Sequence, residues 1–500
     1  MDQRRSGLLL HITSLPGPLP NGVLGEEAIA LMDGMAASGT KVWQFLPIGP
    51  THGHGSPYES LSTFAGNPDL IDLRSYVAAG WLTERVLAAV IAGTCSLKAA
   101  RESMVAAFGT ALGAALEEGQ GDGKLAVEWQ AFVADTAFWL EDYALFFAIR
   151  QTHDGLPWWQ WEKMLRDHDG AALAVFSDSN GALLMQAKME QFLFARQWQQ
   201  LKEAACARGI VLLGDLPIYV SHDSADVWAH RPLFTVNAAG MCDEVAGVPP
   251  DYFSETGQRW GNPLYHWNRM AEDDFSWWVE RVRCQHARVD WLRIDHFRGL
   301  ESYWAIPGDR QDGRIGEWRP APGAALLDAL QRHLGELPLV AEDLGMITEQ
   351  VHALRKEFAL PGMKILQFAF GGDAANPYLP HNHSRDMVAY TGTHDNDTTV
   401  GWWQGLDANT RDHVADYLGI ERGDGNAATQ AATALMRQTL ASVANIAVLP
   451  VQDLLLLDGA SRLNTPGTVD GNWSWRLSVD QFEDMPWLQL KEWNRLYGRD

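Results

Sequence analysis

Residues 289–297 read Val-Asp-Trp-Leu-Arg-Ile-Asp-His-Phe, a short apolar run that ends in an acidic side chain. The same arrangement recurs in Gly214-Asp215-Leu216-Pro217, Ala341-Glu342-Asp343-Leu344-Gly345 and Thr393-His394-Asp395-Asn396-Asp397. A carboxylate just past a buried strand lies at the strand's C-terminal edge, where a (β/α)8 barrel gathers its catalytic groups. The four segments therefore predict acidic groups that face one pocket, an arrangement suited to sugar chemistry.

Eight short apolar segments have the composition of buried parallel strands. They span residues 7–12, 41–48, 209–218, 289–297, 339–344, 363–370, 387–393 and 446–451. Several are near-continuous runs of Val, Ile, Leu and Phe without alternation, as expected for strands covered on both faces. Helical patterns such as 324–334 and 427–444 lie between them. This alternation to a count of eight predicts an α/β fold, with residues 1–500 forming a single (β/α)8 TIM barrel rather than an open sheet.

Two connections are too long to be simple crossovers. Residues 69–208 are rich in helical patterns, with amphipathic stretches at 83–92, 99–118, 129–150 and 183–207. Residues 219–282 are rich in Gly, Pro and aromatic residues and have little periodicity. Long loops in compact proteins are usually functional. We therefore expect the first segment to be a helical insertion and the second a loop insertion over the active site.

The composition limits the partners and the compartment. There are 39 Lys and Arg residues against 63 Asp and Glu residues, and the net charge of −24 would repel nucleic acid and anionic membranes. The four cysteines lie far apart, without the spacing of a metal site or a disulfide framework. Neither a signal peptide nor an apolar run of membrane-spanning length is present. The sequence predicts a soluble, cytoplasmic protein with no nucleic-acid or membrane partner.

Asp295 is the first candidate catalytic residue. Arg293 precedes it by two positions, so both side chains point to the same face of the predicted strand. A nearby cation lowers the pKa of a carboxyl group and keeps it ionised, which suits a nucleophile. The alternative is that Arg293 and Asp295 form a structural ion pair.

Glu342 is the second candidate. It directly follows the apolar run 339–341, and apolar surroundings favour the protonated form that a general acid needs. Asp343 points the other way and is expected to be a structural partner. The alternative is that Glu342 is an ordinary strand-end carboxylate in water.

The segment 390–399 gathers polar groups at another strand end. As metal ligands, His394, Asp395 and Asp397 would lack the spacing and the distal Glu of a calcium loop, so we predict no metal. A hydrogen-bonded turn is one alternative, and recognition of sugar hydroxyls is the other. The second fits better beside the other carboxyl groups. The 22 tryptophans offer flat faces for sugar rings, although most are expected in the core.

These segments, taken in order with several others, resemble the 4-α-glucanotransferases called amylomaltases or disproportionating enzymes, relatives of the α-amylases. The further segments are Ser56-Pro57-Tyr58 and residues 64–68, 139–146, 214–220, 246–254, 257–263, 464–468 and 471–476. Each of these motifs is weak alone, but the ordered set is specific and covers nearly the whole chain.

The resemblance implies a role for each candidate. Asp295 would be the nucleophile, Glu342 the acid and then the base, and Asp395 the group that grips ring hydroxyls in the transition state. Further residues would line the sugar sites: Ser56, Tyr58, Asp215, Gln258, Trp260, Arg293, His296, His394 and Asn464. From their place in the long second insertion, we expect Tyr252 and Phe253 to cover the pocket mouth and keep water out.

The resemblance also implies the reaction. It is a retaining double displacement on α-1,4-glucans, with maltooligosaccharides as donors and acceptors, glucose as acceptor or product, and no cofactor. The barrel would lack the C-terminal β-domain of amylases.

Two other functions remain open. A hydrolytic α-amylase-type glycosidase would use the same three carboxyl groups with water as acceptor. A non-catalytic glucan-binding protein could be built on a decayed barrel, but such a protein has no use for a general acid.

Overall fold

The computed structural model describes residues 1–117, 123–250, 254–421, 426–468 and 470–500. Its main sheet has eight parallel strands in the order β10-β11-β12-β1-β2-β3-β6-β9. They are β1 (Arg5–Leu9), β2 (Val42–Gln44), β3 (Val211–Pro217), β6 (Trp291–Asp295), β9 (Leu339–Ala341), β10 (Gly362–Ile365), β11 (Met387–Tyr390) and β12 (Ile446–Pro450). Each of the eight predicted segments overlaps one of these strands, so the predicted barrel is confirmed.

The sheet curls until its two outer strands, β9 and β10, meet. The amide of Ala341 donates to the carbonyl of Pro361 at 2.9 Å, and the amide of Met363 donates to the carboxylate of Asp343 at 2.7 Å. Asp343 is therefore a structural partner, as predicted. In β12, Ile446 and Val448 join an apolar cluster that contains residues of the other strands, whereas Ala447 and Leu449 belong to the surrounding core. The strands are thus apolar on both faces because one face fills the barrel and the other meets the helices.

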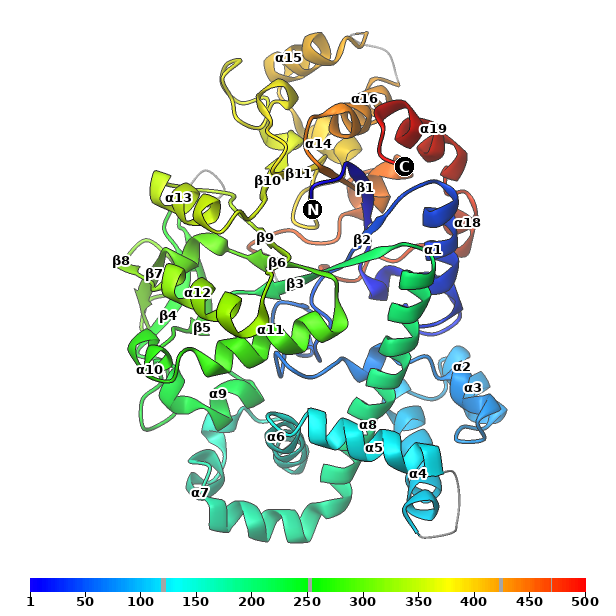
Figure 1. Ribbon diagram of the computed structural model, residues 1–500, viewed down its shortest axis with the longest axis vertical. Helices are drawn as coiled ribbons and strands as arrows, with labels where there is room; N and C mark the ends of the chain where they lie inside the picture. The colour runs from blue at the N-terminus through cyan, green and yellow to red at the C-terminus, as the bar shows by residue number, and fades with distance from the viewer. Residues whose placement is uncertain (118–122, 251–253, 422–425, 469) are drawn as a thin grey trace.

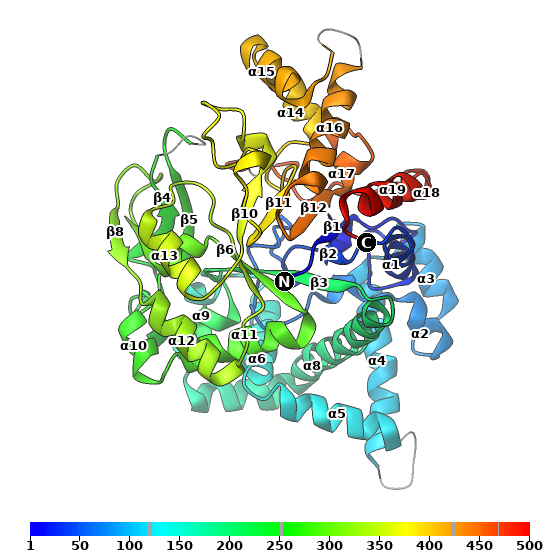
Figure 2. The same ribbon diagram turned by 45° about the horizontal axis from the view of Figure 1, so that its top comes forward.

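Helices cover the outside of this barrel (Figures 1 and 2). The helices outside the two predicted insertions are α1 (Glu26–Ala37), α12 (Gly323–Leu334), α13 (Glu349–Glu357), α14 (Thr399–Gly405), α15 (Ala408–Leu418), α16 (Ala427–Ala441), α17 (Val451–Leu454), α18 (Val479–Glu483) and α19 (Trp487–Tyr497). No helix of the described residues is long and apolar enough to cross a membrane.

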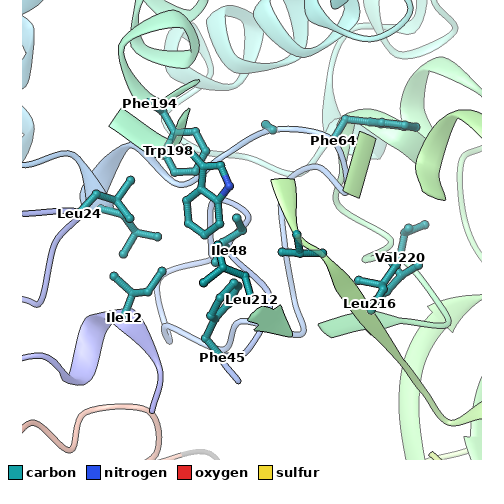
Figure 3. Packing of buried hydrophobic residues seen from close by; sticks show 14 of the residues in the cluster. Ile12, Leu24, Phe45, Ile48, Phe64, Phe194, Trp198, Leu212, Leu216 and Val220 are labelled. Carbon is teal, nitrogen blue, oxygen red and sulfur yellow. The ribbon is translucent and has the colours of Figure 1, made fainter. Parts of the chain in front are cut away.

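The first insertion is helical. Between residues 69 and 208, leaving out 118–122, the structure describes seven α-helices: α2 (Arg74–Ala78), α3 (Glu84–Ile91), α4 (Leu97–Leu116), α5 (Gly123–Asp135), α6 (Leu140–Thr152), α7 (Lys163–Arg166) and α8 (Gly170–Ala207). The pattern at 129–150 is divided between α5 and α6, because a turn directs Phe138 and Trp139 together onto Phe64. The long α8 packs on the barrel through Trp198, whose ring meets that of Phe45 at 5.6 Å (Figure 3).

The second insertion contains more regular structure than its composition indicated. It holds α9 (Ala225–Ala229), β4 (Glu244–Val248), β5 (Gln258–Pro263) and α10 (Trp267–Glu272) and leads into α11 (Ser276–Arg288). With β7 (Ser302–Pro307) and β8 (Glu317–Pro320), its strands form an antiparallel sheet of order β5-β4-β7-β8. Two strands thus come from before β6 and two from after it, and each is too short to give a clear alternating pattern.

The first and last strands of the main sheet, β1 and β12, lie side by side, with Leu9 opposite Pro450. Arg499 secures this junction. Its side chain is fully buried and donates to five backbone carbonyls, those of Arg5, Leu440, Ser442, Ala444 and Asn445. Within the described residues after β12 there are helices and loops and no strand.

Candidate active site

The strand ends of the barrel open into a cavity of about 960 Å³. Eleven of the predicted site residues line it: Ser56, Tyr58, Gln258, Trp260, Arg293, Asp295, His296, Glu342, His394, Asp395 and Asn464. Asp215 lies directly behind Tyr58 and Arg293. Tyr252 and Phe253 lie outside the described residues. Four strand ends therefore bring the predicted carboxyl groups to one place.

Asp295, the last residue of β6, is held by Arg293. The Arg293 guanidinium is 2.9 Å from Asp295 Oδ1. It also donates to both carboxylate oxygens of Asp215 at 2.7 Å. The Tyr58 hydroxyl donates to Asp215 as well, at 2.7 Å. Burial lowers the pKa of Arg293, but Asp215 and Asp295 outweigh it and raise that pKa well above its ordinary value. Asp215 is fully buried, whereas the side chain of Asp295 is 30% exposed in the cavity. Arg293 thus forms the structural ion pair with Asp215 and still gives Asp295 a fixed cation.

Glu342 follows β9 and is 9% exposed, which excludes an ordinary carboxylate in water. Its two oxygens accept from the amides of His296 at 2.7 Å and Leu344 at 2.9 Å. Burial raises the pKa of Glu342 to about 8; Arg293 opposes this rise and Asp295 adds to it. The raised pKa favours the protonated form, which a general acid needs.

The backbone fixes Glu342 beside Asp295. The Glu342 amide donates to the carbonyl of Ile294, and the Phe297 amide donates to the carbonyl of Glu342, both at 3.1 Å. These two bonds lie on either side of Asp295 and His296 and hold both residues next to the end of β9. The candidate nucleophile and the candidate acid therefore sit on adjacent, hydrogen-bonded chain segments.

Asp395 lies in the loop after β11, and its side chain is 45% exposed. Asn464 donates to its Oδ1 at 2.6 Å, and His394 Nε2 lies 3.3 Å from its Oδ2. The His394 ring stacks on that of Tyr58 at 5.2 Å. One oxygen of Asp395 is thus positioned by Asn464, and the carboxylate faces the cavity, where ring hydroxyls of a sugar could reach it.

His296 has a left-handed backbone with φ of 53°, which is strained for a residue with a Cβ. The turn brings its ring against Trp260 at 4.8 Å, and Trp260 in turn donates to Gln258 at 3.1 Å. Burial lowers the pKa of His296 to about 4, so the imidazole is neutral. In the described part of the chain its Nε2 is buried and has no hydrogen-bond partner.

Comparison with known proteins decides the family. A family model described as 4-alpha-glucanotransferase matches residues 10–481. The chain belongs to the 4-alpha-glucanotransferase family. It is 44% identical over 506 residues to a 4-alpha-glucanotransferase of Synechocystis sp., covering 100% of this chain and 99% of that protein. It is 45% identical over 482 residues to the 4-alpha-glucanotransferase of Thermus thermophilus, covering 95% of each.

A solved structure supports the same assignment. The amylomaltase from Streptococcus agalactiae in complex with acarbose matches with a TM-score of 0.91 and 34% identity, over 99% of this chain and 100% of that one. The protein is therefore a 4-α-glucanotransferase, a glycosyltransferase that acts on α-1,4-glucans. The hydrolytic and the non-catalytic alternatives are not favoured.

Sequence reasoning missed two supports of this glucanotransferase site. Arg462 donates to the backbone carbonyls of Asp395 and Asn464, both at 2.6 Å. Asp453, which is buried, accepts from Thr391 and Thr399 at either end of the Asp395 loop. The position of Asp453 just past β12 follows the strand-end pattern and could have revealed it. Arg462 bonds main-chain atoms, so no residue pattern marks it.

Asn464→Ala is expected to lower kcat for transfer from maltotriose by about tenfold or more, because a hydrogen bond to a charged group contributes about 1.5–3 kcal/mol. The loss should fall on kcat rather than on folding. Initial rates and thermal unfolding would be compared with Asn472→Ala, which removes another amide of the same loop that bonds Thr465 and Thr468 instead. An equal loss in both variants would contradict a specific role for Asn464.

Proposed function

We propose that this 4-α-glucanotransferase transfers α-1,4-glucan segments between maltooligosaccharides by a retaining double displacement through a covalent glycosyl-enzyme. The observation that carries the proposal is the pairing of a cavity-facing, Arg-bound Asp295 with a buried Glu342 of raised pKa on the adjacent segment. A retaining mechanism requires the two carboxyl groups to lie about 5 to 5.5 Å apart. We expect that separation in a crystal structure.

In the first half-reaction, an oxygen of Asp295 attacks C1 of the sugar to be transferred. The bond from C1 to the glycosidic oxygen breaks, and that oxygen takes the proton of Glu342 as the reducing-end part departs. Arg293 keeps Asp295 oriented and stays charged throughout. Asp395 accepts hydrogen bonds from ring hydroxyls as the ring flattens.

In the second half-reaction, the carboxylate of Glu342 takes the proton from the 4-hydroxyl of an acceptor sugar. The acceptor oxygen then attacks C1, and the bond to Asp295 breaks, which restores both carboxyl groups. Every proton and electron pair is accounted for by carboxyl groups and sugars, so the reaction needs no cofactor. Glucose has a 4-hydroxyl and qualifies as the smallest acceptor.

Tyr252 and Phe253 are proposed to keep water from this ester. They fall in the sequence between Pro249 and Ser254, both of which line the cavity. We also propose a cytoplasmic location, on the strength of the four free thiols. Relatives from plants are named chloroplastic or amyloplastic, which describes those proteins.

Incubation with maltotriose tests the function. The full product ladder and the total of reducing ends would be followed together. Transfer gives longer and shorter maltooligosaccharides, including glucose, at a constant number of reducing ends. Rising reducing ends would mean hydrolysis, and an unchanged substrate would mean that the protein only binds glucans.

The pH dependence should report Glu342. Its raised pKa keeps the acid form present up to about pH 8, and the proton is lost as the pH rises through that value. The kcat/KM for maltotriose should therefore fall above about pH 8, roughly tenfold per further pH unit. With α-maltosyl fluoride, whose leaving group needs little protonation, fluoride release in the first turnover should stay level there. A fall with both donors would assign the titration to another group.

A further inference from the structure

Part of the cavity wall lies away from the catalytic carboxyl groups. Near Asp395 the wall is the loop around Asn464 and Trp473, whereas elsewhere it runs to Trp318 on β8. In both views of the molecule, β8 lies on the far side of β6 from β11, the strand that leads to Asp395 (Figures 1 and 2). Trp318 and Asp395 therefore belong to different parts of the cavity wall.

The indole of Trp318 is held in place by packing against Trp304. Trp304 stands directly opposite on β7, and the two rings meet edge to face at 5.3 Å. Trp304 is itself fixed, because its Nε1 donates to the carbonyl of Gly313 at 3.0 Å. A Cβ at Gly316 would lie 2.6 Å from the Trp304 ring, so only glycine fits there.

Arg298 connects this indole to the catalytic segments. It lies three residues after Asp295 in the sequence, and its guanidinium is 3.9 Å from the centre of the Trp318 ring. It also donates a hydrogen bond to the carbonyl of Met346, which lies four residues after Glu342. The residue is only 7% exposed, yet within the described chain its Nε has no hydrogen-bond partner. Burying an incompletely paired cation is costly. A contribution to fold stability therefore does not by itself explain why the Arg298 guanidinium lies at the wall of the substrate cavity.

The chemistry of Glu342 indicates which sugar unit lies near Trp318. An acid that protonates the glycosidic oxygen stands on the side of the leaving group, and the acceptor later takes that same side. The segment 344–346, which follows Glu342, lines the cavity next to Arg298 and Trp318. Asp395 and Asn464, in contrast, belong to another part of the cavity wall, where the proposed mechanism holds the transferred unit.

We propose that Trp318, backed by Arg298, is an acceptor-side subsite for a glucose unit beyond the one that reacts. A pyranose ring would lay its C–H face on the indole, and Gln311 and Asp312, which line the same cavity, would meet its hydroxyl rim. The enzyme then prefers maltooligosaccharide acceptors long enough to reach Trp318 over glucose. This inference rests on the proposed function and names what selects the acceptor.

The test varies acceptor length with α-maltosyl fluoride as donor, because fluoride leaves the acceptor side empty. Acceptors run from glucose to maltohexaose, and KM is measured for each. In Trp318→Ala, KM should rise about tenfold for the longer acceptors, equivalent to 1.4 kcal/mol, and stay unchanged for glucose. Trp318→Phe, which keeps a flat face, should recover most of the loss.

Arg319→Ala is the matched control. Arg319 is the next residue of β8, and its side chain pairs with Glu244 instead of lining the cavity. Its acceptor profile should equal that of the wild type. Equal losses for glucose and for long acceptors in Trp318→Ala, or no change for any acceptor, would each overturn the subsite. Failure of the wild-type enzyme to transfer to glucose or any longer acceptor would instead contradict the proposed function.

Discussion

Asp295→Asn is expected to reduce transfer from maltotriose by about 10⁴-fold or more, the scale of loss when a covalent nucleophile is removed. An amide oxygen in place of the carboxylate cannot form the glycosyl ester on which the two-step route depends. The variant should still fold, because Asn has nearly the same shape and Arg293 keeps its bonds to both oxygens of Asp215. Initial rates of transfer and mass spectrometry of the enzyme during turnover measure the effect.

Asp290→Asn provides the matched control. Asp290 directly precedes β6, and it accepts from the amide of Leu212 at 2.8 Å, a bond that an Asn oxygen can also accept. Its activity and thermal unfolding should match those of the wild type. Near-normal turnover in Asp295→Asn, or a glycosyl adduct still found on that variant, would disprove Asp295 as nucleophile.

Glu342→Gln has the second largest expected effect, a loss of about 10²- to 10⁴-fold with maltotriose, because the leaving sugar is no longer protonated. The first half-reaction should be spared when the leaving group is fluoride. A burst of one fluoride per enzyme from α-maltosyl fluoride, followed by slow turnover, would separate the two steps. The glycosyl-enzyme should accumulate, since the second step also needs Glu342 as base.

Glu349→Gln is a suitable comparison, because Glu349 begins α13 and is exposed to solvent. It should behave as the wild type with both donors. If Glu342→Gln lost fluoride release and maltotriose transfer to the same degree, the variant would have lost something other than proton donation.

The barrel and the convergence of the candidate catalytic residues could be predicted because both follow local patterns. Parallel strands buried on two faces appear as near-continuous apolar runs, and the carboxyl groups come directly after them in the chain. Asp295 and Glu342 each needed only the few residues before them to be recognised. Arg293 and the apolar run before Glu342 suggested their roles but left structural alternatives open, and the resemblance to a family chose between them.

Other parts of the site depend on contacts that a sequence does not display. The sheet β5-β4-β7-β8 joins strands that lie before and after β6 in the sequence. Trp318 can be recognised as a candidate sugar-binding residue only from its contacts with Trp304 and Arg298 in the folded chain. Arg462 acts on backbone carbonyls, which every residue has. The depth of burial that raises the pKa of Glu342 to about 8 likewise comes from the assembled barrel.

The pairing of β1 with β12 has a consequence for biosynthesis. In a chain of 500 residues made at 5–20 residues per second, β1 leaves the ribosome on the order of a minute before its neighbour exists. During that time the edge of β1 that later pairs with β12 has unpaired backbone N–H and C=O groups, which can pair with strands of other nascent chains. Closure of the barrel, and with it the assembly of the carboxyl groups, therefore waits until β12 has been made. Premature termination before β12 should yield an aggregating protein rather than a weakened enzyme.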